Sequence, residues 1–203
     1  MMITLFTFPQ TRGMRAIWML EEARCEYRIE PIDIRDASAK SHPAFAAASP
    51  LGKVPAIVDG DVAMAESAAI CLYLADRYKD AKLSPAVDSP ERGEFLFWLM
   101  YTPAVMEPCM AEAFGTAKAN RASHGWADFD SMINALTARL TDRTWVMGED
   151  FSAADVLLGS SVNFLQMFGI MPENAAVLAD YLKRCAARPA FQAAAAASLP
   201  PSD

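Results

Sequence analysis

The sequence predicts a two-part protein, in which an α+β N-terminal domain is followed by an all-helical C-terminal domain. Three observations predict this fold class. Within about the first eighty residues, short strand-like runs alternate with helix-like runs. A polar stretch with two prolines follows at residues 78–91. After it, apolar residues recur only at helical spacing, so we expect domains at 1–79 and 90–203 and a linker over 80–89.

The composition excludes several classes of protein. The chain has 203 residues, of which 53% are hydrophobic and 21% charged, as is typical of a globular protein with a sizeable core. A net charge of −7 offers no basic surface to nucleic acid or anionic lipid. No apolar run is long enough to span a membrane and the N-terminus has no signal-peptide pattern, so a cytoplasmic protein is expected. The two histidines and four cysteines form no cluster, so we expect no metal site and free thiols.

The first domain begins with an alternating run at residues 3–8, Ile-Thr-Leu-Phe-Thr-Phe, which predicts a β-strand. After a turn, a helix is predicted from residue 14 to residue 24. A second strand is predicted over 27–34, and Pro31 within it indicates an edge position or a bulge. A loop and a short helix are predicted over 36–48.

The stretch from residue 49 to residue 70 carries the most informative pattern. A Val-Pro pair at 54–55 opens a short apolar strand, and Asp-Gly at 59–60 is typical of a hairpin turn into a second strand. A helix is predicted to begin at the Glu-Ser pair at 66–67, with apolar residues along one face. The resulting order of elements is β-α-β-α-β-β-α, which is the order of a thioredoxin-like domain.

Two features of this stretch indicate a binding site. If the peptide bond before Pro55 is cis, the backbone N–H and C=O of Val54 turn outward. Glu66 and Ser67 place a carboxylate and a hydroxyl at a helix N-terminus, where free N–H groups and the helix dipole favour a bound carboxylate. Each feature alone also suits an edge-strand proline or an ordinary helix cap. Their combination, with the hairpin between them, favours a site.

The run Ser-Pro-Leu-Gly-Lys-Val-Pro at 49–55, followed by Glu66 and Ser67, resembles the glutathione-binding half of glutathione transferases. The resemblance extends over essentially the whole chain. It implies that Val54 and Pro55 hold the cysteinyl backbone of glutathione. It also implies that Glu66 and Ser67 bind the γ-glutamyl end of the tripeptide.

The resemblance implies the remaining site residues as well. Lys40, fourteen positions before Val54, stands where related classes place a polar or basic residue against the glycyl carboxylate, and Lys53 is a second candidate for that contact. Aligning residues 15–18 with the family's Arg-x-hydrophobic segment brings Thr11 to the position of the serine of theta-like classes and the cysteine of the beta class. Thr11 is therefore implied as the catalytic residue, which donates to the glutathione sulfur through its hydroxyl or its backbone N–H. The same hydroxyl also suits a helix cap.

The second domain is predicted to contain helices alone. An aromatic-rich helix is expected over 91–101, and Pro103 and Pro108 are expected to bend or break the helix that follows. Ser152 and Asp155 fit a capping box at the start of another helix. The same box resembles the one that begins the core helix of the family's second domain, so Asp155 is interpreted as a residue of folding and not of catalysis.

The resemblance implies a cytosolic glutathione transferase of the bacterial theta/nu-like kind, acting as a homodimer with glutathione as co-substrate. Such an enzyme binds glutathione, stabilises its thiolate and catalyses attack on a hydrophobic electrophile or a peroxide. Because the turn around Thr11 contains neither tyrosine nor cysteine, a glutathione-binding regulatory protein with little transferase activity stays open as an alternative. A glutathione-dependent disulfide-bond reductase, which usually has a cysteine or a poised threonine or asparagine in this turn, is a second alternative. A thioredoxin-like interaction module without a glutathione site is a third alternative, against which the paired motifs argue.

Overall fold

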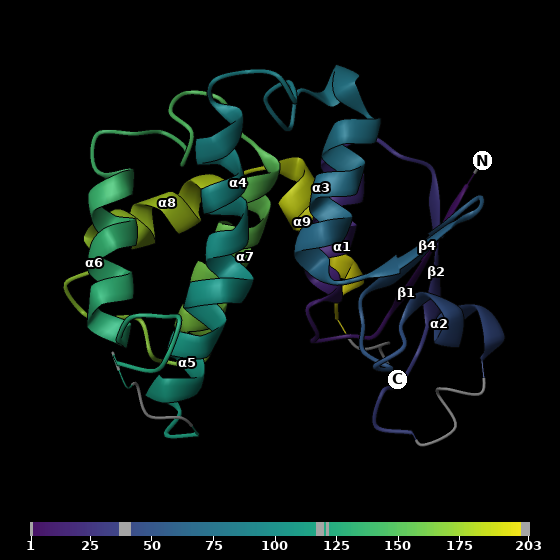
Figure 1. Ribbon diagram of the computed structural model, residues 1–203, viewed down its shortest axis with the longest axis horizontal. Helices are drawn as coiled ribbons and strands as arrows, with labels where there is room; N and C mark the ends of the chain where they lie inside the picture. Colours follow the sequence, from purple (N-terminus) through teal and green to yellow (C-terminus); the bar gives the residue numbers. More distant parts are fainter. Residues whose placement is uncertain (1, 37–41, 117–119, 121, 200–203) are drawn as a thin grey trace. The chain divides into compact units, whose positions relative to one another are not determined.

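The chain forms two compact units in a computed structural model that describes residues 2–36, 42–116, 120 and 122–199 (Figure 1). One unit contains the residues up to Leu83 together with the C-terminal segment that begins at Arg188. The other unit is Ser84–Ala187. The predicted fold class, α+β followed by all-helical, is confirmed. The prediction had counted the segment from Arg188 with the helical domain, whereas this segment packs with the first unit.

The first unit is built on a four-stranded mixed sheet, whose strands are β1 (Ile3–Thr7), β2 (Tyr27–Pro31), β3 (Ala56–Asp59) and β4 (Val62–Ala65). Their order across the sheet is β2-β1-β3-β4. Strand β1 runs parallel to β2 and antiparallel to β3, and β3 and β4 form the predicted hairpin. Strand β2 is therefore an edge strand, which explains why it tolerates Pro31.

In its described residues the first unit also has four α-helices: α1 (Gly13–Glu22), α2 (Pro43–Ala48), α3 (Ser67–Arg77) and α9 (Pro189–Ala197). Helices α1 and α3 lie on one face of the sheet and α2 lies on the other (Figure 1). The ring of Phe45 on α2 packs against Phe6 of β1 in an apolar cluster that also contains Val54. Residues 13–20 of α1 are all buried, because α1 packs against α3, α9 and the sheet.

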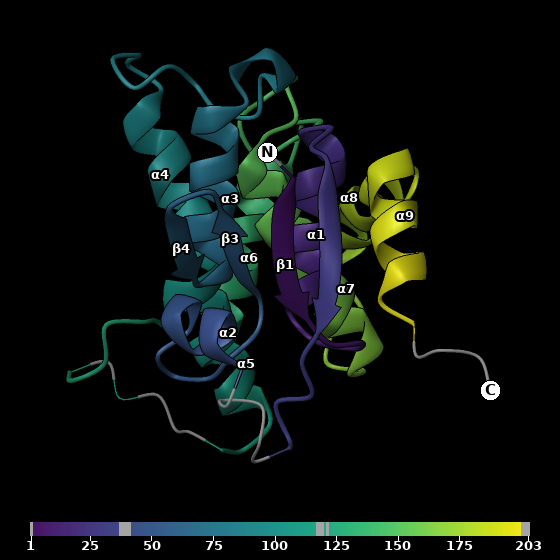
Figure 2. The same ribbon diagram turned by 90° about the vertical axis from the view of Figure 1, so that its right-hand side faces the viewer.

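Helix α9 is fastened to α1 by a polar and an aromatic contact. Arg188 Nη2 donates to Glu22 Oε2 at 2.7 Å, and its Nε donates to Oε1 of the same carboxylate. The rings of Trp18 and Phe191 meet edge to face with centroids 4.9 Å apart. Trp18 Nε1 also donates to Glu22 Oε1 at 2.9 Å. Figure 2 shows α9 beside α1, so the C-terminal end of the chain completes the first unit.

Among its described residues the second unit has five α-helices, which are α4 (Arg92–Tyr101), α5 (Glu107–Ala113), α6 (Phe129–Leu140), α7 (Ala153–Met167) and α8 (Ala176–Ala186). A π-helical segment at Thr102–Met106 joins α4 to α5, and the Glu107 N–H donates to the Thr102 carbonyl across it. Pro103 has no N–H to continue the α-helical pattern, so the widened turn occurs where the sequence predicted a break.

Asp155 organises the start of α7 from a fully buried position. Its Oδ2 accepts from the backbone N–H and the hydroxyl of Ser152, both at 2.9 Å, which confirms the capping box. Its Oδ1 accepts from the Val146 N–H at 2.8 Å and the Tyr181 hydroxyl at 3.0 Å. Burial raises the pKa of Asp155 to about 6, and the bonds from Val146, Ser152 and Tyr181 oppose this rise.

Two sequence expectations concern features of the whole chain. All four cysteines are free thiols, and Cys71, Cys109 and Cys185 are buried. Among the residues that the structure describes, none of the helices has both the length and the apolar character needed to cross a membrane.

Candidate functional site

The loop before β3 carries the predicted Val-Pro pair, and its peptide bond is cis. Ser49 closes this loop: its hydroxyl donates to the Lys53 carbonyl at 2.8 Å and accepts from the Lys53 N–H at 2.9 Å. The Val54 side chain is buried in the apolar cluster beneath α2. Within the described ranges, the backbone N–H and C=O of Val54 make no hydrogen bond to the rest of the chain. These groups are therefore available to the backbone of a ligand.

The second predicted feature lies at the N-terminus of α3. Glu66 precedes the helix with φ 73° and ψ 114°, a conformation that a residue with a side chain rarely adopts. Ser67 is the first residue of the helix and is 7% exposed. The free N–H groups of this first turn, the helix dipole and the Ser67 hydroxyl together favour a bound carboxylate.

Sequence reasoning did not include Arg15 among the site residues. Arg15 lies on the buried side of α1 with an exposed fraction of 1%, and its Nη1 donates to Ser67 Oγ at 3.3 Å. A buried guanidinium requires partners, and here it places a positive charge beneath the start of α3. An arginine between Met14 and the apolar run Ala-Ile-Trp-Met-Leu was the signal available in the sequence.

The turn between β1 and α1 contains Thr11, the predicted catalytic residue. Its hydroxyl donates to the Phe8 carbonyl at 2.7 Å and accepts from the Gly13 N–H at 3.1 Å. The hydroxyl therefore closes the turn and pairs with the N–H of the first residue of α1, whose N-cap residue is Arg12. In the described part of the chain the Thr11 N–H has no acceptor. Of the two donors expected for the glutathione sulfur, the backbone N–H is the one that the turn leaves available.

Gly13 allows the strand and the helix to approach closely at this turn. A Cβ atom on Gly13 would lie 1.6 Å from Thr7 Oγ1 and 3.1 Å from Thr11 Oγ1. Thr7 is only 5% exposed, and its hydroxyl has no hydrogen-bond partner among the described residues. Glycine is therefore required at position 13 because the Thr7 side chain occupies the space of a Cβ atom.

The predicted site residues differ in how the first unit places them. Three of them, Thr11, Ser67 and Val54, are connected through β1 and α1. Thr11 lies in the turn that joins β1 to α1, and Arg15 of α1 donates to Ser67. Val54 belongs to the same apolar cluster as Phe6 of β1. The side chain of Lys53 is exposed beside Val54. Lys40 lies outside the described residues.

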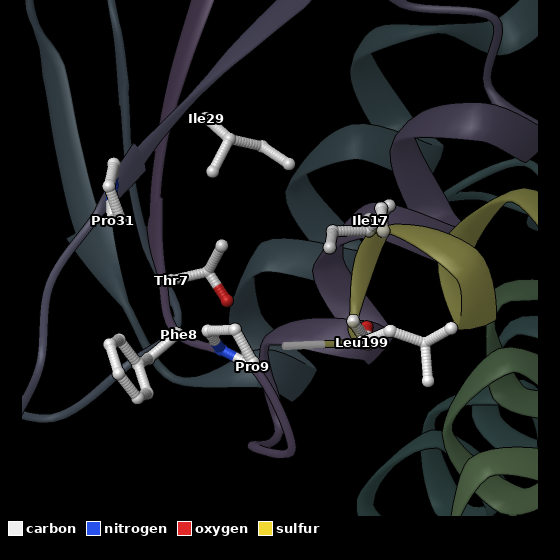
Figure 3. A pocket seen from close by; sticks show the side chains of 9 residues that line it. Thr7, Phe8, Pro9, Ile17, Ile29, Pro31 and Leu199 are labelled. Atoms are coloured by element: carbon white, nitrogen blue, oxygen red, sulfur yellow. The ribbon is translucent and has the colours of Figure 1, made fainter. Parts of the chain in front are cut away.

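A small pocket of about 200 Å³ lies behind the turn, also within the first unit. Figure 3 shows side chains of β1, β2 and α1 facing the C-terminal segment across it. Its lining residues are Thr7, Phe8, Pro9, Ile17, Ile29, Pro31, Ala197, Ser198 and Leu199. Among the described residues, none of the predicted glutathione contacts lines this pocket, so the pocket is distinct from the positions of Thr11, Val54 and Ser67.

The described ranges contain His, Cys, Asp and Glu side chains, which are the types that bind metals. No group of three or more His, Cys, Asp or Glu side chains is arranged there to hold a metal ion. The expectation of a reaction without a metal stays a prediction.

Comparison with known proteins assigns both parts of the chain. Residues 1–76 match the family model of the glutathione S-transferase N-terminal domain, and residues 98–189 match that of the C-terminal domain. The chain is 31% identical over 205 residues to a probable glutathione S-transferase of Oryza sativa subsp. japonica, GSTF2, with 93% of each chain covered. It is 29% identical over 175 residues to the disulfide-bond oxidoreductase YfcG of Escherichia coli, with 80% of each covered.

A solved structure agrees with these sequence matches. The sphingomonad glutathione S-transferase in complex with glutathione superposes with a TM-score of 0.80 at 26% identity, covering 96% of this chain and 98% of that chain. Both family models, the Oryza sativa relative aligned over 93% of each chain and the shared fold support one conclusion: the chain belongs to the glutathione S-transferase family.

Proposed function

We propose that this protein is a glutathione transferase that binds glutathione, stabilises its thiolate and catalyses attack on a hydrophobic electrophile or a peroxide. The observation that carries the proposal is the N-terminus of α3, where Arg15 beneath Ser67 adds positive charge to the free N–H groups of the helix. This arrangement suits the α-carboxylate of the γ-glutamyl residue. Glu66 beside it is a partner for the α-amino group of the same residue.

The rest of the tripeptide follows the strand edge. The unpaired N–H and C=O of Val54 suit the two complementary groups of the cysteinyl residue, and Pro55 orients them through its cis bond. Lys53 would contact the glycyl carboxylate, and Lys40 is proposed as a second contact to the same group. Bound in this direction, the cysteinyl thiol would point to the turn between β1 and α1.

At that turn the Thr11 N–H is the proposed donor to the sulfur. A free cysteine thiol titrates near 8.5, and a hydrogen bond to the thiolate lowers this pKa because it stabilises the charged form. The adjacent N-terminus of α1 acts in the same direction. The thiolate then forms a bond to the electrophilic carbon and the leaving group departs with the electron pair. With a hydroperoxide, the thiolate attacks the terminal oxygen, the O–O bond breaks, and the alkoxide departs with the electron pair and takes a proton from water. The glutathione sulfur is then a sulfenic acid, which a second glutathione converts to the disulfide with release of water.

Other parts of the assignment stay predictions. These are the theta/nu-like class, the homodimer and the cytoplasmic location. The relatives include a disulfide-bond oxidoreductase as well as a probable glutathione S-transferase. The identity of the electrophile is therefore a matter for a substrate screen.

The proposal is tested by calorimetric titration of glutathione into the protein. We expect saturable binding in the micromolar to millimolar range, which the Ser67→Ala variant weakens at least tenfold, since loss of a bond to a charged group costs about 1.5–3 kcal/mol. Ser123→Ala is the matched control, because Ser123 is exposed in the second unit. A folded protein that gives no heat with glutathione would contradict the proposal.

A glutathione-dependent disulfide-bond reductase is the second candidate function. It is supported by the similarity to the Escherichia coli disulfide-bond oxidoreductase over 80% of both chains and by the threonine in the catalytic turn. Activity on a mixed disulfide of glutathione without conjugation of an aryl halide would favour this candidate. Tight glutathione binding without either activity would favour a regulatory protein.

A further inference from the structure

The C-terminal end of the chain contacts the turn that holds Thr11. Helix α9 packs along α1, and beyond its last turn the carbonyl of Ser198 accepts a hydrogen bond from the Gln10 N–H at 3.2 Å. Gln10 is the residue directly before Thr11. This bond therefore joins the C-terminal segment to the turn across most of the length of the sequence.

Gln10 has an uncommon backbone conformation for a residue with a side chain, with φ 58°. The left-handed conformation is unfavourable for such a residue, so surrounding contacts must maintain it. The torsion angles of Gln10 also set the orientation of the peptide plane that links Gln10 to Thr11. That plane contains the Thr11 N–H, the proposed donor to the glutathione sulfur.

The acceptor is itself held in place. The Ser198 N–H donates to the Ala194 carbonyl at 3.1 Å, and the Ser198 hydroxyl donates to the same carbonyl at 2.7 Å. Ala194 is fully buried in α9, which Arg188 and Phe191 fix to α1. The position of the Ser198 carbonyl thus follows from the docking of α9.

A pocket lies behind the turn, beside the bond between Gln10 and Ser198. About 200 Å³ of space separates the side chains of the strand ends from the C-terminal segment, with Thr7 and Pro9 on one side and Leu199 on the other (Figure 3). The bond between Gln10 and Ser198 joins the segment to the turn beside this pocket.

We infer that Ser198 is a positioning residue of the thiol site: through Gln10, its backbone carbonyl fixes the direction of the Thr11 N–H. The inference rests on the proposed function and adds to it a structural element far from the binding motifs in the sequence. It assigns to the end of α9 an effect on the ionisation of bound glutathione that is distinct from binding of the tripeptide.

Two truncated chains test this inference. A chain that ends at Ala197 lacks the acceptor, whereas a chain that ends at Leu199 keeps it and is the matched control. The pKa of the bound thiol is measured from the ultraviolet absorbance of the thiolate as a function of pH. We expect the shorter chain to raise this pKa by about half a unit or more, which is about 0.7 kcal/mol. Its affinity for glutathione should stay within about twofold, and the longer chain should match the intact protein.

A second variant separates positioning from a loss of folding. An ester in place of the amide between Pro9 and Gln10 removes the Gln10 N–H in a chain of full length, and Cys25 offers a junction for ligating a synthetic segment of residues 1–24. This variant should raise the thiol pKa in the same direction. A lower melting temperature with an unchanged thiol pKa in both altered chains would overturn the inference. Failure of the intact protein to bind glutathione would instead overturn the proposed function.

Discussion

Arg15 and Ser67, 52 positions apart in the sequence, are joined by a hydrogen bond of 3.3 Å from the guanidinium Nη1 to the serine Oγ. Arg15 is 1% exposed and Ser67 is 7% exposed. The bond connects the helix that follows the catalytic turn with the helix that begins at the predicted γ-glutamyl site. A buried charge at this junction has consequences for both stability and ligand binding.

Replacing Arg15 by glutamine removes the charge and retains some hydrogen-bonding capacity. We expect the free energy of unfolding to fall by about 1.5–3 kcal/mol, because the variant loses bonds made by a buried charged group. Glutathione affinity should fall at least tenfold, because positive charge near the bound carboxylate is lost. Urea denaturation and calorimetry measure the two effects. Arg28→Gln on the exposed side of β2 is the matched control, and equal effects of the two variants would contradict the role of Arg15.

Replacing Gly13 by alanine should destabilise the first unit. The new methyl group would lie 1.6 Å from Thr7 Oγ1, so β1 and α1 must move apart. Overpacking of this kind costs about 1–3 kcal/mol. Urea denaturation of Gly13→Ala, Thr7→Ala and the double variant measures the coupling. We expect Thr7→Ala to recover part of the loss, since it removes the hydroxyl that clashes. Strictly additive effects would show that the clash is relieved elsewhere.

The pH dependence of stability should reveal the buried carboxyl of Asp155. Its pKa is about 6 in the folded protein and lies near 3.8 without the fold. The folded protein therefore holds the proton more tightly, so the contribution of this group is full below the unfolded pKa and decreases as pH rises through 6. Between pH 4 and pH 7 the decrease should be about 2.4 kcal/mol.

The measurement for Asp155 is a comparison with Asp155→Asn across this pH range, because other titrating groups are common to both proteins. The stability of the natural chain relative to the variant should fall as pH rises. A relative stability that rises with pH would show that the hydrogen bonds outweigh burial. Asp155→Ala should be less stable at every pH by about 2–4 kcal/mol, since the Val146 N–H and the Tyr181 hydroxyl lose their acceptor.

The ion pair between Glu22 and Arg188 should stabilise the docking of α9. Their side chains are 9% and 29% exposed, and two parallel hydrogen bonds join them. A double-mutant cycle with glutamine at each position should give a coupling of about 1–2 kcal/mol. Lys183 and Asp180, which are largely exposed, are the control pair, for which about 0.5 kcal/mol or less is expected. Similar couplings for the two pairs would contradict a special role for Glu22.

Several features of the fold could be predicted because they follow from local rules. Alternation of apolar residues identified β1, and the Asp-Gly turn identified the hairpin of β3 and β4. Ser152 and Asp155 are three positions apart, so the capping box was visible before any packing was known. The Val-Pro pair and the Glu-Ser pair were recognisable for the same reason, since each lies within one short segment.

The candidate site was only partly predictable, because its details depend on elements that are distant in the sequence. The hydroxyl of Thr11 was a candidate donor from its position alone, but the folded turn gives its hydrogen to the Phe8 carbonyl. Lys40 was likewise a candidate from spacing alone, and it lies outside the described residues. The position of a residue in the sequence predicts that it lies in a turn, whereas the folded backbone determines which of its hydrogen-bonding groups can still bind a ligand.

The sequence by itself determined the fold class, the order of strands and helices in the first unit and the two short motifs of the site, since these depend on neighbouring residues. Only the tertiary structure decided that Arg15 lies beneath Ser67, that Thr7 excludes a side chain at position 13, and that α9 returns to the first unit to place Ser198 against Gln10. These relationships arise because the packing of helices on the sheet brings residues that are distant in the sequence within hydrogen-bonding or van der Waals distance. The periodicity of apolar residues predicts helices and strands, but it does not predict the distances between them.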